Sequence, residues 1–175
     1  MTPAITINSL LRLRCPIKGF LYHAVEIVAR INVLPSSPKL LHKVTIQPRK
    51  NSRPVCSCCG KQGPTYDSAK DARAFDHVPL WNIPVRFYYR MRRVSCRHCN
   101  RVTTEWVPWA TGKHRHTHDF RIILAQWAHL LSWKDCARMF HSKWDSVFRS
   151  VQWVVQCTFP PSDRILGVFL AELRL

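Results

Sequence analysis

The chain reads Cys56-Ser57-Cys58-Cys59-Gly60 at one point and Cys96-Arg97-His98-Cys99-Asn100 further on. Each stretch contains a Cys-x-x-Cys pair, and the two-residue spacer lets one tight turn present two sulfur atoms to one metal ion. Each stretch also ends in a residue that tolerates the positive φ of such a turn. The sequence therefore predicts a tetrahedral zinc (Zn²⁺) site whose ligands are Cys56, Cys59, Cys96 and Cys99.

The segment between the two pairs, residues 60–95, is longer than in the commonest small zinc fingers. This length favours a zinc ribbon whose hairpin carries an insertion; buried free thiols are the alternative. Cys58 would make a poorer chelating turn with Cys56, so we expect Cys59 to be the ligand. We expect His98 at the surface or at a phosphate.

The remaining cysteines, Cys15, Cys136 and Cys157, lie on apolar faces or near chain ends and are expected to be packing residues. His114, His116 and His118 alternate in a loop, so a second metal site is conceivable there. Solvated loop histidines are the favoured interpretation.

A strand is predicted at Leu41–Gln47, and a second begins at Val85 with a period of two. One face of the second strand is apolar, and the other is cationic and aromatic as it approaches Cys96. Arg90 and Arg92 lie on the cationic face and Arg93 follows, so we expect all three to contact DNA.

The 175 residues include 27 Lys+Arg against 10 Asp+Glu, which gives a formal net charge of +17. Such a charge attracts polyanions, and counterion release drives binding to DNA. The first residues do not resemble a signal peptide, and His23, Glu26 and Arg30 interrupt the longest apolar tract. The sequence therefore predicts no membrane span and a reducing, cytoplasmic setting in which thiolates bind metal.

The predicted fold class is α+β, with a small zinc-ribbon β domain followed by a three-helix domain. We expect an N-terminal helical segment at residues 1–40, because Leu21, Ala24 and Val28 fall on one helical face. A zinc-ribbon-like domain at 41–110, a helix-turn-helix domain at 111–158 and a tail at 159–175 complete the expected organisation.

The helix-turn-helix prediction rests on apolar periodicity and on two capping boxes, at residues 132–135 and 142–145. The first helix is expected to run from about His118 to Leu131. Its expected buried stripe is Phe120, Ile123, Leu124, Trp127, Leu130 and Leu131. The short interval between the two boxes leaves only a tight turn between the second and third helices, as in DNA-binding proteins.

The third helix is expected to bury Trp144, Val147, Phe148, Val151, Val154 and Val155. Its opposite face would present Ser146, Arg149 and Trp153 to double-stranded DNA, flanked by Lys143 and Ser150. An arginine such as Arg149 can bind a guanine edge in the major groove, and Lys143 would lie close to phosphate. The alternative is a plain three-helix bundle with a solvated face.

Several stretches in order resemble the ISL-three family of bacterial insertion-sequence transposases. They are residues 48–56, 78–81, 91–94, 131–134 and 144–150. The resemblance implies a zinc ribbon and a helix-turn-helix that recognise the terminal repeats of the element. It also implies a ribonuclease-H-like domain after them, with three acidic residues that bind Mg²⁺.

In the tail, Phe169 stands where the family places a metal-binding aspartate, and only Asp163 and Glu172 are acidic. We therefore expect the DNA-binding fragment of a truncated transposase that is not itself an enzyme. A homodimer, or association with a full-length transposase, is compatible with this interpretation. The alternative function is a stand-alone zinc-containing helix-turn-helix transcription regulator. A zinc hydrolase is disfavoured, because four thiolates leave no coordination position for water.

Overall fold

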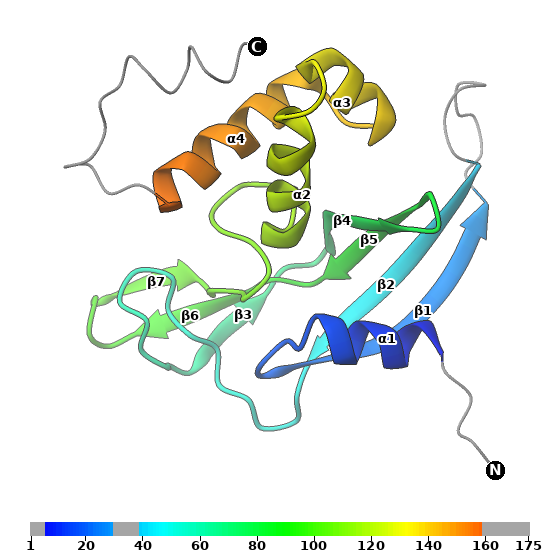
Figure 1. Ribbon diagram of the computed structural model, residues 1–175. Helices are drawn as coiled ribbons and strands as arrows, with labels where there is room; N and C mark the ends of the chain where they lie inside the picture. The colour runs from blue at the N-terminus through cyan, green and yellow to red at the C-terminus, as the bar shows by residue number, and fades with distance from the viewer. Residues whose placement is uncertain (1–5, 30–38, 159–175) are drawn as a thin grey trace. The chain divides into compact units, whose positions relative to one another are not determined.

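The computed structural model describes residues 6–29 and 39–158. It is a mixed α+β structure, as the sequence predicts, and it divides into two compact units, Met1–Thr117 and His118–Leu175 (Figure 1). The expected tail at 159–175 lies outside the described residues.

The first unit is built on a four-stranded sheet with the order β1-β2-β5-β4. Its strands are β1 (Phe20–Ala29), β2 (Leu40–Pro48), β4 (Arg73–Leu80) and β5 (Ile83–Tyr89). β2 and β5 are parallel, with His42 opposite Val85, and the other two pairings are antiparallel. Helix α1 (Ile7–Arg14) begins after Thr6, whose hydroxyl accepts the Ser9 amide at 3.2 Å, and contacts β1.

The core of this unit lies on one face of the sheet and is rich in aromatic residues. Val44, Phe75 and Phe87 are completely buried. The Trp109 ring makes edge-to-face contacts with Phe20 at 4.9 Å, and further such contacts with Phe75 and Tyr89. These contacts join the segment that contains Trp109 to β5 and to both edge strands of the sheet, β1 and β4.

The expected helix at the second half of the N-terminal segment is wrong, because residues 20–29 form β1. Phe20 and Tyr22 are buried while Leu21 and His23, which alternate with them, are exposed, and this is the period of a strand. Aromatic and β-branched residues favour a pleated, half-buried surface over a helix, and pairing with β2 supplies that surface. Ile31, also assigned to the helix, lies outside the described residues.

The hairpin that joins β4 to β5 was missed, because residues 60–80 show no convincing period. Trp81 and Asn82 form its two-residue turn with φ of 49° and 62°, the backbone of a type I′ turn. Phe75 on β4 pairs with Phe87 on β5 and completes the core.

A second, three-stranded antiparallel sheet has the order β3-β6-β7. Its strands are β3 (Thr65–Ser68), β6 (Arg92–Cys96) and β7 (Arg101–Thr104). The long strand predicted from Val85 to the second cysteine pair is therefore two strands in two sheets, separated at Arg90 and Met91. β4 and β5 are the insertion that the long spacing between the cysteine pairs predicts.

The expected boundary between residues 40 and 41 is not a domain boundary. β1 pairs with β2 along its length, so the N-terminal segment and the ribbon belong to one unit. The division falls after Thr117 rather than near residue 110.

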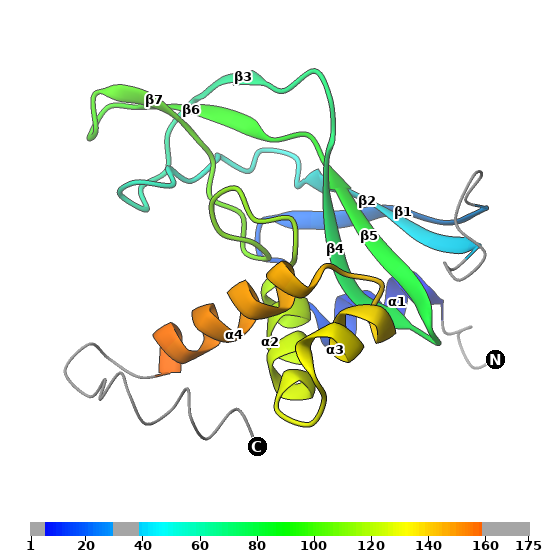
Figure 2. The same ribbon diagram turned by 90° about the horizontal axis from the view of Figure 1, so that it is seen from above.

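The second unit contains α2 (His118–Ala128), α3 (Trp133–Met139) and α4 (Trp144–Thr158), and α4 lies across α2 (Figure 2). Phe120, Leu124, Cys136 and Val147 are buried between the helices. Ser132 caps α3, as predicted, by accepting the Asp135 amide at 3.2 Å.

Three details of the predicted helices are wrong. α2 ends at Ala128, so Leu130 is exposed, and Trp127 is more exposed than a core residue. Trp144 is also exposed, because it occupies the first position of α4. The second capping box does not form: α4 begins after Lys143, whose carbonyl accepts the Ser146 and Val147 amides, and the buried Ser142 hydroxyl has no partner among the described residues.

Candidate metal centre and nucleic-acid interface

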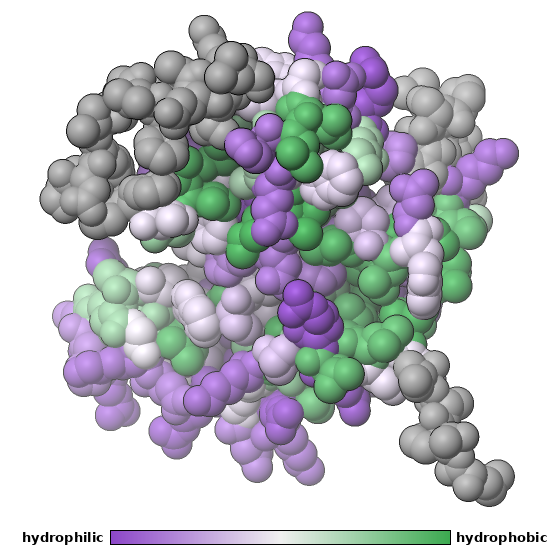
Figure 3. All heavy atoms as spheres, in the orientation of Figure 1, coloured by the Kyte–Doolittle hydropathy of each residue, from purple (hydrophilic) through white to green (hydrophobic). Residues whose placement is uncertain are grey.

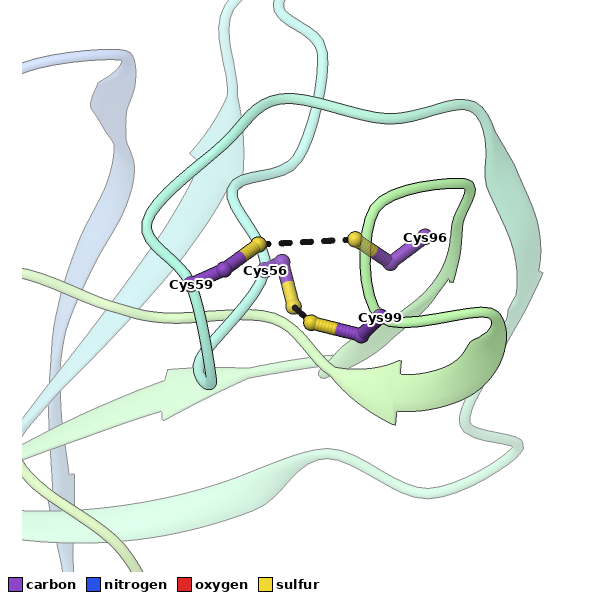
Figure 4. A group of neighbouring side chains, drawn as sticks. All are labelled: Cys56, Cys59, Cys96 and Cys99. Atoms are coloured by element: carbon purple, nitrogen blue, oxygen red, sulfur yellow. Dashed lines mark hydrogen bonds between the residues drawn. The ribbon is translucent and has the colours of Figure 1, made fainter.

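The structure brings Cys56, Cys59, Cys96 and Cys99 together, with their sulfur atoms within 4.8 Å of one another. Figure 4 shows the four side chains pointing toward one another from two loops. The Sγ atoms of Cys59 and Cys96 are 3.5 Å apart, and those of Cys56 and Cys99 are 3.9 Å apart. These separations exclude disulfides, whose sulfur atoms lie about 2.05 Å apart. The four cysteines form a site that can hold a metal ion.

The donor set fits a tetrahedral ion in size as well as in chemistry. A regular tetrahedron with zinc–sulfur bonds of about 2.3 Å has sulfur–sulfur edges of about 3.8 Å. The two measured separations lie on either side of this value. The other four separations are at most 4.8 Å, so the four sulfurs are close enough together to surround one ion.

Each pair of ligands sits in a tight turn that closes as the sequence predicts. Gly60 and Asn100 end the two turns with φ of 70° and 48°, the left-handed region that both residues tolerate. In the first turn the Gly60 amide bonds to the Cys56 carbonyl at 3.0 Å, and the Cys58 amide donates to the Cys56 sulfur at 3.4 Å. Backbone donors therefore already face a sulfur that becomes a thiolate on metal binding.

Cys58 is not one of the four clustered cysteines, and it accepts a hydrogen bond from the Arg101 guanidinium at 3.0 Å. This placement agrees with the assignment of Cys59, rather than Cys58, to the metal site. His98 is exposed beside Lys61, with 3.3 Å between its Nδ1 and the lysine Nζ.

The thiols of the cluster differ in acidity in a way that favours a bound cation. A hydrogen bond with the Thr103 hydroxyl, helped by backbone amides, lowers the pKa of Cys56 to about 6. Hydrogen bonding with Cys59, together with desolvation, raises the pKa of Cys99. Four adjacent thiolates repel one another, which opposes deprotonation of all four thiols. A bound divalent cation compensates this repulsion.

A buried ion pair lies next to the candidate metal centre, and no local pattern in the sequence predicts it. Glu105 accepts the Tyr89 hydroxyl at 2.5 Å, the Arg92 amide at 2.7 Å and the Arg92 guanidinium at 2.8 Å. Arg92 also donates to the Ser52 carbonyl at 2.9 Å. Cys56 bridges to Glu105, so the pair joins the first cysteine turn to both sheets.

This network corrects the expected role of Arg92. The residue is buried and neutralised by Glu105, so it does not belong to a DNA-facing surface. The alternation that placed it on a cationic face fails because the chain changes sheets at Arg90 and Met91. Arg90 is exposed, and Arg93 is exposed but paired with Asp67.

Lys143, which directly precedes α4, and Arg149 on α4 are both exposed. Arg149 lies 3.2 Å from Asp145, one helical turn away. Ser146 is half-buried, and its carbonyl accepts the Ser150 hydroxyl at 2.7 Å.

Ser150 and Trp153 do not lie on the exposed face to which the sequence assigned them. Ser150 is buried. The Trp153 ring stacks on His118 at 5.2 Å, and the Arg121 guanidinium lies over it at 4.2 Å. The buried face of α4 is therefore rotated from the expected one, because α2 packs against the Trp153 side of the helix.

Two polar residues outside the predicted set of DNA contacts share the exposed face with Arg149. Gln152 follows Arg149 by three residues, Gln156 follows Gln152 by four, and both are exposed. Asp145 completes the row one turn before Arg149. The spacing was available in the sequence as a signal, but Trp153 was taken as the centre of the face instead.

The three loop histidines do not form a metal site within the described residues. The His116 ring lies 3.9 Å from an Asp76 carboxylate oxygen, and His118 stacks on Trp153. The His114 carbonyl accepts the Arg73 guanidinium at 2.9 Å. Cys136 is buried, as expected, whereas Cys157 is exposed.

Comparison with protein-family models, with curated proteins and with solved structures finds no match to this chain. In the part of the chain that the structure describes, every helix is too short or too polar to cross a membrane.

Proposed function

We propose that this chain binds double-stranded DNA as a zinc-stabilised part of a transposase and recognises the terminal repeats of an insertion sequence. The observation that carries the proposal is the row of exposed side chains Arg149, Gln152 and Gln156 on α4. Arginine and glutamine are the side chains that bind guanine and adenine edges through two hydrogen bonds. A helix that displays them in one row can read adjacent base pairs from the major groove.

The connection between α3 and α4 supports this interpretation. The Ser142 amide bonds to the Ala137 carbonyl at 2.9 Å and the His141 amide to the Arg138 carbonyl at 3.3 Å, while His141 has a φ of 49°. This Schellman motif ends α3 and turns the chain sharply into α4. A short, fixed turn between two helices is the element by which helix-turn-helix proteins present the second helix to DNA.

Zinc has a structural role in the proposal. Four cysteine ligands fill a tetrahedral coordination sphere, so the ion would hold the ribbon together and leave no position for a reacting water. Cys56, Cys59, Cys96 and Cys99 would hold it, and Thr103 would donate a hydrogen bond to the Cys56 thiolate.

Binding to duplexes selected from random sequence, followed by competition with scrambled duplexes, tests the proposal. Arg149→Ala is expected to weaken the selected duplex roughly tenfold or more and to relax preference at one position, as for loss of a bidentate arginine contact. Arg138→Ala, an exposed arginine on α3 that is paired with Asp135, is the matched control. Equal affinity for selected and scrambled DNA would refute specific recognition.

The form of the selected site separates the proposed function from a transcription regulator. A regulator that binds as a dimer gives a palindromic site, whereas a transposase module gives an asymmetric end. Incubating the selected duplex with the chain and Mg²⁺ tests the expectation that the chain is not an enzyme: strand cleavage would refute it.

A further inference from the structure

The small sheet has an outer face that the metal centre does not use. β6 and β7 pair Arg93 with Thr104 and Ser95 with Val102. Val102, Thr104 and Trp106 are exposed at alternate positions, while Thr103 and Glu105 between them are half-buried and buried. We call Tyr66, Arg93, Val102, Thr104 and Trp106 the ribbon face.

The ribbon face exposes two large aromatic rings on a rigid element. Tyr66 is 60% exposed and Trp106 is 46% exposed. The space-filling view shows hydrophobic atoms among hydrophilic ones at the left edge, where Figure 1 draws β6 and β7 (Figure 3). Exposed aromatic rings of this kind are costly in water and are typical of binding surfaces.

Arg93 is held in place between a ring and a carboxylate. Its guanidinium lies 5.3 Å from the centre of the Tyr66 ring, and its Nε donates to Asp67 at 2.6 Å. The guanidinium lies over one face of the Tyr66 ring and so helps to hold the ring in place.

The surroundings of the ribbon face are strongly basic. Three exposed cations lie in the two cysteine turns and just after them: Lys61, Arg97 and Arg101. Twenty of the 27 lysines and arginines, but only five of the ten acidic residues, lie in residues 1–117. An occupant of the ribbon face therefore carries flat apolar groups and negative charge together.

We propose that the ribbon face binds unpaired nucleotides of single-stranded DNA by stacking bases on Tyr66 and Trp106. Single-stranded nucleic acid alone combines exposed base faces with a continuous row of phosphates, and cationic grooves with aromatic platforms bind it with little sequence preference. In a duplex the base faces are covered by their neighbours. The proposal is independent of duplex recognition by α4.

Fluorescence anisotropy with the full, zinc-loaded chain tests the proposal on two labelled probes. One is oligothymidylate of about 12 nucleotides, within the span that one such module covers. The other has the same backbone with abasic sites, so it carries the same charge without bases. The chain is expected to bind the abasic probe at least about tenfold more weakly, since stacking on each ring contributes on that order.

Variants locate the binding. Tyr66→Ala and Trp106→Ala are each expected to weaken the affinity for oligothymidylate roughly tenfold. The affinities for the abasic probe and for a blunt duplex are expected to stay unchanged. Tyr66→Phe and Trp106→Phe keep the rings and should retain most of the affinity. Trp81→Ala, which removes a ring that is 73% exposed at the turn between β4 and β5, is the control.

Equal binding of the two probes by the wild-type chain would overturn the proposal, and this comparison does not depend on the folding of any variant. An equal loss of affinity for oligothymidylate and for the duplex in the alanine variants would also overturn it. If duplex specificity fails while oligothymidylate remains preferred over the abasic probe, duplex recognition is refuted and the ribbon face stands.

Discussion

Cys58 and Cys59 are neighbours in the chain but face different partners, the Arg101 guanidinium and the sulfur cluster. Cys59→Ser is expected to abolish stoichiometric zinc binding, because a hydroxyl is a poor ligand for zinc. Cys58→Ser is expected to retain one zinc per chain. Zinc content of the purified variants by mass spectrometry measures both. Loss of zinc from Cys58→Ser alone would show that the first turn binds through the other spacing.

Glu105 is the shared acceptor in the buried network with Tyr89 and Arg92 beside the candidate metal centre. Glu105→Gln leaves the Arg92 guanidinium buried without its counter-charge, so the free energy of unfolding is expected to fall by about 3–5 kcal/mol. Urea denaturation of the zinc-loaded chain measures it. Asp67→Asn removes the partner of the exposed Arg93 and should have little effect. The double variant Arg92→Met/Glu105→Leu should recover part of the loss, because it removes both buried charges.

His42 makes stability depend on pH. It is buried on β2, its ring nitrogens have no partner among the described residues, and burial lowers its pKa. Below its ordinary value near 6.5 the unfolded chain takes up the proton first, so stability is full above that pH and falls as the pH drops toward the folded pKa. Urea denaturation between pH 7.5 and pH 5 should show a smaller decrease in His42→Phe than in the wild type.

At the scale of elements, the sequence predicted the parts whose signal is local. The turns of the metal centre depend on residues a few positions apart, and the three helices show a clear apolar period. The failures depend on distant partners. Residues 20–29 satisfy a helical period, but they form a strand because they pair with β2. The buried side of α4 includes Trp153, because this ring stacks on His118 of α2. Arg92 is predicted to contact DNA but is buried instead, because it forms an ion pair with Glu105 on another segment of the chain.

The turn between α3 and α4 contains a residue with a strained backbone, and a substitution can relieve this strain. His141 adopts a left-handed conformation that costs a non-glycine residue roughly 1 kcal/mol. His141→Gly is therefore expected to raise the free energy of unfolding of its unit by about 0.5–1 kcal/mol, after part of the gain is offset by the freer unfolded chain. Urea denaturation measures it. Arg138→Gly within α3 is the control and should lower stability by about 1 kcal/mol. A lower stability for His141→Gly would mean that the imidazole makes a contact worth more than the strain.

For the whole molecule, most of the positive charge lies in one unit, and the exposed Arg149, Gln152 and Gln156 lie in the other. Residues 118–175 carry seven lysines and arginines against five acidic residues, so the helical unit is close to neutral, and residues 1–117 hold the excess. The slope of log affinity against log salt for a non-specific duplex should therefore depend mainly on the first unit, because each phosphate contact contributes about 0.9 to its magnitude.

Replacing Lys61 and Arg97, which are exposed in the cysteine turns, by glutamine is expected to reduce the magnitude of this slope by about 1–2 if both contact phosphate. Arg138→Gln on α3 should leave it nearly unchanged, because Asp135 already neutralises that arginine at 2.9 Å. Affinity titrations between low and moderate salt measure the slopes. The opposite pattern would place the phosphate contacts on the helices, and the ribbon charge would then need another polyanion to explain it.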